Sequence, residues 1–146
     1  MNKIAETYEQ DFYAWAIHNA ELLRQGRLSE IDVEHIAEEL ECMGRSEKRE
    51  LMRRLGVLLA HLLKWVYQPY RRSRSWRATI KAQREDLKAL LEESPSLKPE
   101  LEQKLNEAYR RAKIEAEKQT GIHKDRFPEV CPFTLGQVLD DDFWPD

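Results

Sequence analysis

Arginines and aromatic rings are concentrated in one short segment of the sequence, residues 64–79, KWVYQPYRRSRSWRAT. The segment holds four arginines and four aromatic side chains in sixteen residues, although the net charge of the whole chain is −3. Guanidinium groups bind phosphates and carboxylates, and aromatic rings stack on bases or on guanidinium groups. The segment therefore predicts either a surface for an anionic partner or a set of internal contacts that fasten the fold.

Helical spacing extends this basic segment along one face. At about 100° per residue, five basic side chains fall within an arc of about 80°. These side chains are Arg74, Arg77, Lys81, Arg84 and Lys88. They lie beside an apolar arc of Trp76, Ile80 and Leu87. Three interpretations are open: pairing with carboxylates of the same chain, contact with nucleic acid, and a site for an anionic ligand or partner.

An acidic segment offers counter-ions for such pairing. Residues 32–44 contain five carboxylates and no lysine or arginine. Two of the five, Asp32 and Glu39, flank the apolar side of the predicted helix, where a partly desolvated carboxylate needs a hydrogen-bond donor. We therefore favour internal pairing, with Glu39 bound to an arginine of the basic segment. We also expect Glu39→Gln to lower stability more than Glu34→Gln.

The histidines and cysteines provide little evidence of catalysis. His61 lies one helical turn before Trp65, but a metal site of the helical-bundle type needs Glu-x-x-His twice, and the chain has only the reverse order at His35 and Glu38. Cys42 and Cys131 lack the spacing of a metal site, and we expect both to be reduced thiols. We predict no catalytic residue, no metal and no cofactor.

Apolar periodicity predicts an all-α fold without strands. The expected helical segments are 7–26, 32–44, 46–68, Ser73 or Ser75 to about 94, 99–121, and a short helix after Thr134. Glycines are expected to end three of them, at Gly26, Gly44 and Gly121. The prediction is a single domain over 1–146, a bundle of about five helices. Its helical core is expected at about 7–121, with segment 46–68 as the central helix. An irregular tail at about 122–146 is expected to dock through Phe133 and Leu139.

Composition narrows the class of protein. The chain has 146 residues, of which 41% are hydrophobic and 35% charged, as expected for a single globular domain. No window has the apolar run of a membrane span or of a signal peptide, so we expect a cytoplasmic protein without membrane contact. Oligomeric state is not indicated by the sequence.

Several segments resemble one known family: YEQDFYAWAIHNAELLRQGR, VEHIAEELECMGRSEKREL, HLLKW, RSRSW and FPEVCPFTLGQVLDDDF. Together they are similar to the domain-of-unknown-function family twenty-nine, common in cyanobacteria and other bacteria, from about Tyr8 to Phe143. The resemblance implies a small, soluble, all-helical bacterial protein, and it brings no activity, substrate or cofactor. Its signature positions are Glu38, Glu39, Gly44, His61, Lys64, Trp65, Arg74, Ser75, Trp76 and Arg77.

The function predicted from these observations is a non-catalytic binding or interaction module. Its partner would be an unidentified protein or an anionic ligand. The predicted contact site consists of Glu39, His61, Trp65, Arg74, Trp76 and Arg77. The alternative is a nucleic-acid-associated protein that uses the basic stripe from Arg74 to Lys88, and a metal-dependent enzyme is a weaker alternative.

Overall fold

The computed structural model describes residues 3–146, with side chains from Thr7 onward. All regular structure in this part of the chain is helical, which confirms the all-α class. The contacts divide the chain into two compact units, Met1–Glu47 (unit 1) and Lys48–Asp146 (unit 2). The single domain predicted over the whole chain stays a prediction, and each unit is described by itself.

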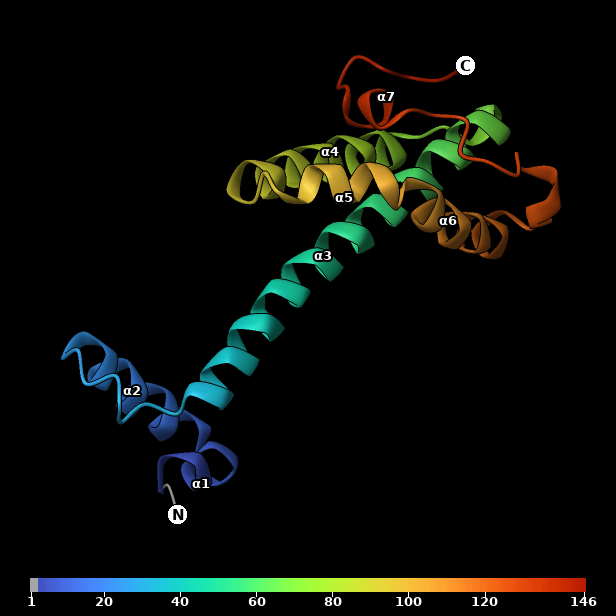
Figure 1. Cartoon of the computed structure of the whole chain (residues 1–146). Coiled ribbons are helices and arrows are strands. Elements are labelled where there is room, and N and C mark those ends of the chain that lie inside the picture. The colour runs from blue at the N-terminus through green and yellow to red at the C-terminus, as the bar shows by residue number, and fades with distance from the viewer. Residues whose placement is uncertain (1–2) are drawn as a thin grey trace. The chain divides into compact units, whose positions relative to one another are not determined.

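Unit 1 begins with two helices, α1 (Lys3–Gln10) and α2 (Phe12–Arg24), that pack against each other (Figure 1). The single helix predicted for 7–26 is therefore wrong. The chain starts a new helix at Asp11, whose carboxylate accepts a hydrogen bond from the backbone N–H of Ala14 at 3.1 Å and caps α2. The predicted end at Gly26 is confirmed by its φ of 71°, a conformation that favours glycine.

The third helix, α3 (Val33–Tyr67), is continuous where the sequence predicted two helices. A glycine that ends a helix adopts a positive φ, and among the described residues only Gly26 and Gly121 do so. Gly44 instead stays helical at a cost of about 1 kcal/mol relative to alanine. The ion pair between Glu41 and Arg45, at 3.7 Å, spans this position and supports the helix.

Unit 2 is built on the second half of α3. Six leucines of this segment are at most 2% exposed, and each buried leucine contributes about 1.5–3 kcal/mol; they are Leu51, Leu55, Leu58, Leu59, Leu62 and Leu63. The prediction that this segment forms the central helix is confirmed. The leucines share one core with residues of α4 (Arg74–Glu93), α5 (Leu97–Gln103) and α6 (Leu105–Thr120).

The helix predicted over 99–121 is divided at Lys104 into α5 and α6. Pro99 lies in the first turn of α5, where the missing N–H of proline costs no helical hydrogen bond. The predicted end at Gly121 is confirmed, since this residue has a φ of 78°. Ala108, Ala112 and Ala116 are buried along α6, as expected for a close helix contact.

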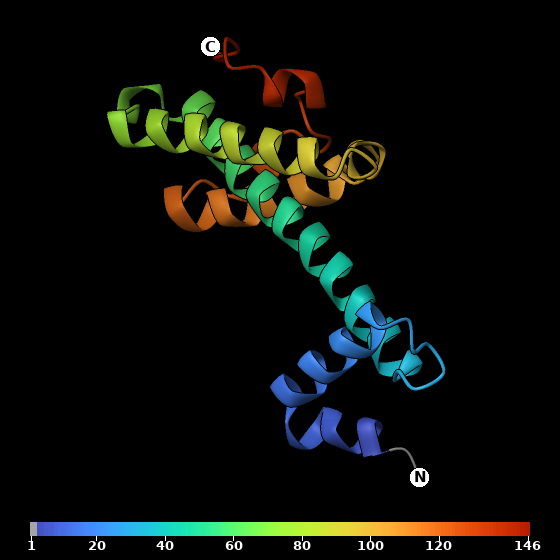
Figure 2. The same ribbon diagram turned by 90° about the vertical axis from the view of Figure 1, so that its left-hand side faces the viewer.

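The C-terminal tail docks on unit 2 as predicted. Its short helix α7 (Leu135–Leu139) lies over α4 (Figures 1 and 2). The side chains of Thr134 and Gln137 form the expected capping box. Phe133 and Val138 are buried, and Leu139 is partly buried against the same core. No helix in residues 3–146 combines the length and apolar composition needed to cross a bilayer.

Candidate functional site

Trp65 is the centre of a cluster of arginines and tryptophans near the end of α3. It is buried, its ring lies 4.9 Å from that of Trp144 in the tail, and the guanidinium groups of Arg72 and Arg77 lie 4.7 and 5.2 Å from its ring centroid. Arg77 also lies 4.8 Å from the Trp144 ring. We call these four residues, together with Arg84, the arginine–tryptophan cluster. It joins α3, α4 and the tail.

Arg84 is the fully buried cation of this cluster. Its Nε donates to the carbonyl of Val138 at 2.8 Å and its Nη2 to the carbonyl of Phe143 at 2.7 Å. Burial lowers the pKa of Arg84, although Asp141 and Asp140 act in the opposite direction. Both hydrogen bonds go to the tail, so Arg84 fastens the tail to α4.

Arg72 makes a second link between α3 and the tail. Its Nε donates to the carbonyl of Trp65 at 2.8 Å, and its Nη2 donates to the carbonyl of Pro145 at 3.4 Å. The planar guanidinium group can therefore stack on the Trp65 ring and use its N–H groups at the same time. The basic segment is an internal fastener in part, as predicted.

The predicted counter-ions of the basic segment are wrong. In the described part of the chain, none of Arg72, Arg74, Arg77 and Arg84 forms an ion pair; two bind backbone carbonyls and Arg77 stacks on rings. Of the predicted stripe, Lys88 does pair with a carboxylate, that of Asp141 in the tail, at 2.7 Å. Carbonyl oxygens accept hydrogen bonds from a guanidinium group as carboxylates do, although Nη1 of Arg84 is buried without a hydrogen-bond partner among the described residues.

Four cations at the start of α4 and in the turn before it face solvent. Arg71, Arg74, Arg77 and Lys81 are exposed, and no carboxylate lies within 4 Å of their charged nitrogens among residues 7–146. We call them the open basic face. Elsewhere in unit 2 some cations are paired, as Arg54 is with Asp86 at 2.7 Å, and others, such as the exposed Arg111, have no ion pair with a described residue. The open basic face therefore has binding capacity that the fold does not use.

Trp76 and His61, two further residues of the predicted site, have structural contacts. The ammonium group of Lys64 lies 4.8 Å from the Trp76 ring centroid and donates to Gln119 at 2.6 Å. Burial lowers the pKa of Lys64. The Nδ1 of His61 lies 2.9 Å from the Val57 carbonyl of its own helix, and burial lowers the pKa of this histidine, which favours the neutral form.

Glu39 lies in unit 1, and its partner is not an arginine. Its carboxylate accepts a hydrogen bond from the hydroxyl of Tyr8. This bond, with partial burial and the negative charges of Glu39 and Glu38, raises the pKa of Tyr8 to about 12. The predicted role of Glu39 as a holder of an arginine is thus corrected.

Around Glu39, unit 1 contains a hydrogen-bond network that sequence reasoning largely missed. Asp32 is buried; its carboxylate accepts from Trp15 Nε1 at 2.9 Å and lies 2.7 Å from His35 Nδ1. Its backbone N–H donates to the side-chain oxygen of Asn19 at 2.9 Å. The ring of Tyr8 stacks on that of His35 at 3.9 Å. The network joins α1 and α2 to the start of α3.

The substitution Glu39→Gln is expected to lower stability more than Glu34→Gln, because only Glu39 accepts a hydrogen bond from Tyr8. The pKa of Tyr8 should also fall toward its ordinary value in the Glu39 variant, because the charged acceptor is lost. A spectrophotometric titration of tyrosinate in the two variants, together with their denaturation midpoints, checks both effects. Equal midpoints and an unchanged titration would contradict the expectation.

The remaining candidates for chemistry have no arrangement typical of catalysis. The Cys131 thiol lies 3.4 Å from the carbonyl of Phe133, and burial raises its pKa, which lowers its fraction of reactive thiolate. Nδ1 of His123 accepts a hydrogen bond from the backbone N–H of Asp125 at 3.2 Å. In the described residues, no group of three or more His, Cys, Asp or Glu side chains is placed to hold a metal ion.

The comparison with protein families gives one match. The family model described as domain of unknown function DUF29 matches residues 7–144, nearly the whole chain. No curated protein and no solved structure matches the chain significantly. The match includes both the network around Asp32 and the arginine–tryptophan cluster. The chain therefore belongs to the DUF29 family.

Proposed function

We propose that this protein is a non-catalytic interaction module of the bacterial cytoplasm that binds an acidic segment of a partner protein on the open basic face. The observation that carries this proposal is the set of four exposed cations, Arg71, Arg74, Arg77 and Lys81, none of which has a carboxylate partner in the part of the chain whose side chains are described. Clustered like charges repel one another, and an anionic partner relieves that repulsion.

The stacking of Arg77 supports this proposal. Its guanidinium group lies against the rings of Trp65 and Trp144, and within residues 7–146 no hydrogen bond occupies its N–H groups. A guanidinium group held in place by its faces keeps its N–H edge free for a bidentate carboxylate. Arg77 would therefore orient the acidic partner, whereas Arg74 and Lys81 would add attraction.

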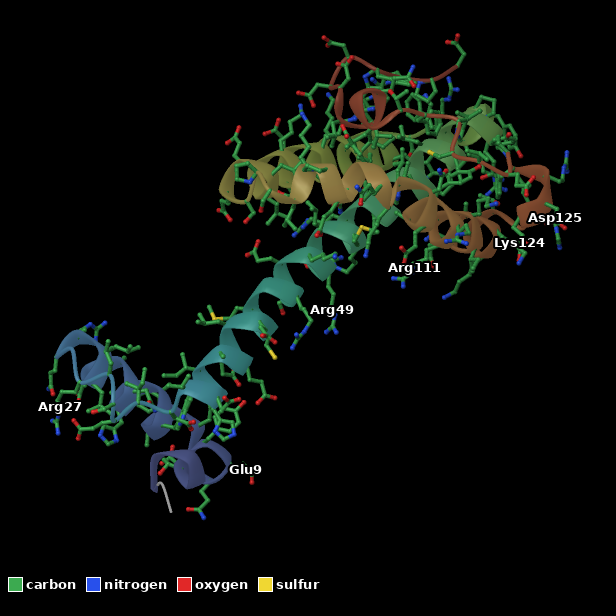
Figure 3. The ribbon with its side chains drawn as sticks, in the orientation of Figure 1. Glu9, Arg27, Arg49, Arg111, Lys124 and Asp125 are labelled. Atoms are coloured by element: carbon green, nitrogen blue, oxygen red, sulfur yellow. The ribbon has the colours of Figure 1, made fainter. Side chains whose placement is uncertain are left out.

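A titration with an oligoglutamate peptide of about twelve residues tests the proposal. The double variant Arg74→Ala/Lys81→Ala is expected to bind this peptide about threefold to tenfold more weakly, and the difference should shrink with added salt. Arg111 provides a matched control because it projects from α6, is exposed and forms no ion pair with any described side chain (Figure 3). If Arg111→Ala weakened binding as much as the double variant, the open basic face would not be the site.

Nucleic acid is the second candidate partner, and one observation favours it. Tyr70, next to Arg71, is 78% exposed, so its ring is available to stack on a base. Titration with a single-stranded oligonucleotide of about twelve nucleotides separates the two candidates. Tighter binding of the oligonucleotide than of oligoglutamate, with a loss of affinity in Tyr70→Ala, would assign the face to nucleic acid.

A further inference from the structure

Unit 1 leaves most of its large apolar side chains uncovered. Among the described residues, eight of the eleven large hydrophobic side chains that are exposed belong to this unit: Phe12, Tyr13, Ile17, Leu23, Leu28, Val33, Leu40 and Met43. Between Thr7 and Glu47, only two hydrophobic side chains, Trp15 and Leu22, are buried. A unit of this size buries little surface by itself, and clustered exposed apolar residues mark interaction sites.

Three of the exposed residues form a stripe on α3. Val33, Leu40 and Met43 fall within an arc of about 80°, and the stripe extends about 15 Å along the helix. Their exposed fractions are 59%, 63% and 64%. We call them the α3 apolar stripe. Gly44 lies beside the stripe, and a side chain built there would meet no atom within 4 Å, so another backbone can approach closely.

The stripe is distinct from the side of α3 that unit 1 already uses. His35 and Glu39 point toward Tyr8, through the ring stacking and the hydrogen bond described above. The helix thus has one side committed to the network around Asp32 and another that is apolar and uncovered. An uncovered stripe with helical spacing is the surface that an amphipathic helix of a partner recognises.

Charge decides which kind of partner fits. Unit 1 contains four lysines and arginines against eleven aspartates and glutamates, a net charge of −7, whereas unit 2 has a net charge of +4. No lysine or arginine occurs between Leu28 and Gly44. A second copy seated on the stripe would bring two units of −7 together, which their repulsion opposes. A basic occupant is attracted instead.

We propose that the α3 apolar stripe docks a basic amphipathic helix of a partner protein. The apolar side chains of that helix would pack on Val33, Leu40 and Met43. Its lysines or arginines would meet Glu47, which is exposed one helical turn beyond Met43 and falls within the same arc. Glu34, Glu38 and Glu41 lie on the other side of the helix and add only long-range attraction. This surface is independent of the open basic face, because the two belong to different units and attract partners of opposite charge.

The probe for the test is a peptide of about eighteen residues that contains only leucine and lysine, with the leucines at helical spacing. Titrated against the full chain, it is expected to bind at least about tenfold more weakly to Leu40→Gln/Met43→Gln than to the wild type. The matched control, Ile114→Gln/Val130→Gln, removes two exposed apolar side chains of unit 2 and should change affinity by less than about twofold.

A second pair of measurements tests the role of charge. The variant Glu47→Gln should weaken binding about threefold at low salt and less at high salt. A leucine–glutamate peptide of the same pattern should bind the wild type at least about tenfold more weakly than the leucine–lysine peptide.

Four outcomes would overturn the proposal. They are absence of binding, equal loss in the variants of units 1 and 2, equal affinity for the leucine–glutamate peptide, and self-association through the stripe. Sedimentation of the wild type and of Leu40→Gln/Met43→Gln detects the last of these. A dimer that only this variant dissociates would assign the stripe to a second copy of the chain.

Discussion

Replacement of Arg84 by alanine is expected to lower the free energy of unfolding of unit 2 by about 3 kcal/mol or more. The variant leaves the buried carbonyl of Val138 and the partly buried carbonyl of Phe143 without their donors, and an unsatisfied buried acceptor costs about 1–3 kcal/mol. It also removes a fully buried side chain from between α4 and the tail. Urea denaturation followed by circular dichroism measures the change. Limited proteolysis of residues 122–146 should show that the tail is released.

The control for this prediction is Lys81→Ala, which removes a cation from the same helix at an exposed position. Its free energy of unfolding should stay within about 0.5 kcal/mol of the wild type. A third variant, Arg84→Met, keeps much of the volume without the donors and separates packing from hydrogen bonding. Wild-type stability in Arg84→Ala, with an equally protected tail, would contradict the role assigned to Arg84.

Replacement of Asp32 by alanine should have the largest effect in unit 1, a destabilisation of about 2–4 kcal/mol. The substitution removes the N-terminal cap of α3, which is worth about 1 kcal/mol, and leaves the buried Trp15 Nε1 without an acceptor, at about 1–3 kcal/mol. It also breaks the contact with His35. Hydrogen exchange of the amides of α1 and α2 measures the loss.

The matched control is Asp11→Ala, because Asp11 caps α2 but is exposed, and among the described residues its side chain accepts a hydrogen bond only from the backbone N–H of Ala14. Its cost should be about 1 kcal/mol. Equal losses in the two variants would show that the network of Asp32 adds nothing to its capping role.

The wild type and Asp32→Ala should also differ in how their stability depends on pH. Burial acts to raise the pKa of Asp32, but hydrogen bonds from His35 and Trp15 outweigh it, so the pKa is lowered. A lowered carboxyl pKa stabilises the fold above the ordinary value of about 4, and this contribution is lost as the pH falls below that value. The wild type should therefore lose more stability than Asp32→Ala between neutral and strongly acidic pH.

The buried role of Arg84 could have been predicted from the helical wheel. Within the basic stripe, Arg84 lies nearest to Ile80 and Leu87, about 40° from Ile80, whereas Arg74 and Lys81 lie about 100° or more away. The structure follows this order, since Arg84 is fully buried and Arg74 and Lys81 are exposed. The hydrogen-bond acceptors of Arg84 could not be predicted. They are backbone carbonyls of a tail more than fifty residues away, and every residue type has a backbone carbonyl.

The helix boundaries, too, could be predicted only in part. Gly26 and Gly121 were predictable as helix ends, and both adopt a positive φ, but Gly44 has the same residue type in a continuous helix. Glycine permits a helix to end without forcing it to do so. The break at Asp11 was not predicted because apolar residues at helical spacing, Tyr8, Phe12 and Trp15, continue across it; the structure uses Asp11 to cap α2.

The predicted contact site was only partly assembled by the fold. Trp65 and Arg77 are in one cluster as expected, yet its other members, Arg72, Arg84 and Trp144, were not among the predicted residues. Glu39 belongs to unit 1 and binds Tyr8. A prediction from charge alone pairs arginines with carboxylates. In the folded chain, hydroxyl groups, aromatic rings and backbone carbonyls compete for the same charged side chains.

The continuity of α3 through Gly44 bears on how unit 1 acquires its structure. To start a helix is costly because several residues must be fixed for the first hydrogen bond, whereas extension adds one bond for each residue fixed. Burial of the leucine-rich half of α3 in the core of unit 2 can offset this free energy of helix nucleation. The segment with Val33, Leu40 and Met43 then needs only extension, so this acidic stretch can stay ordered although few of its side chains are covered.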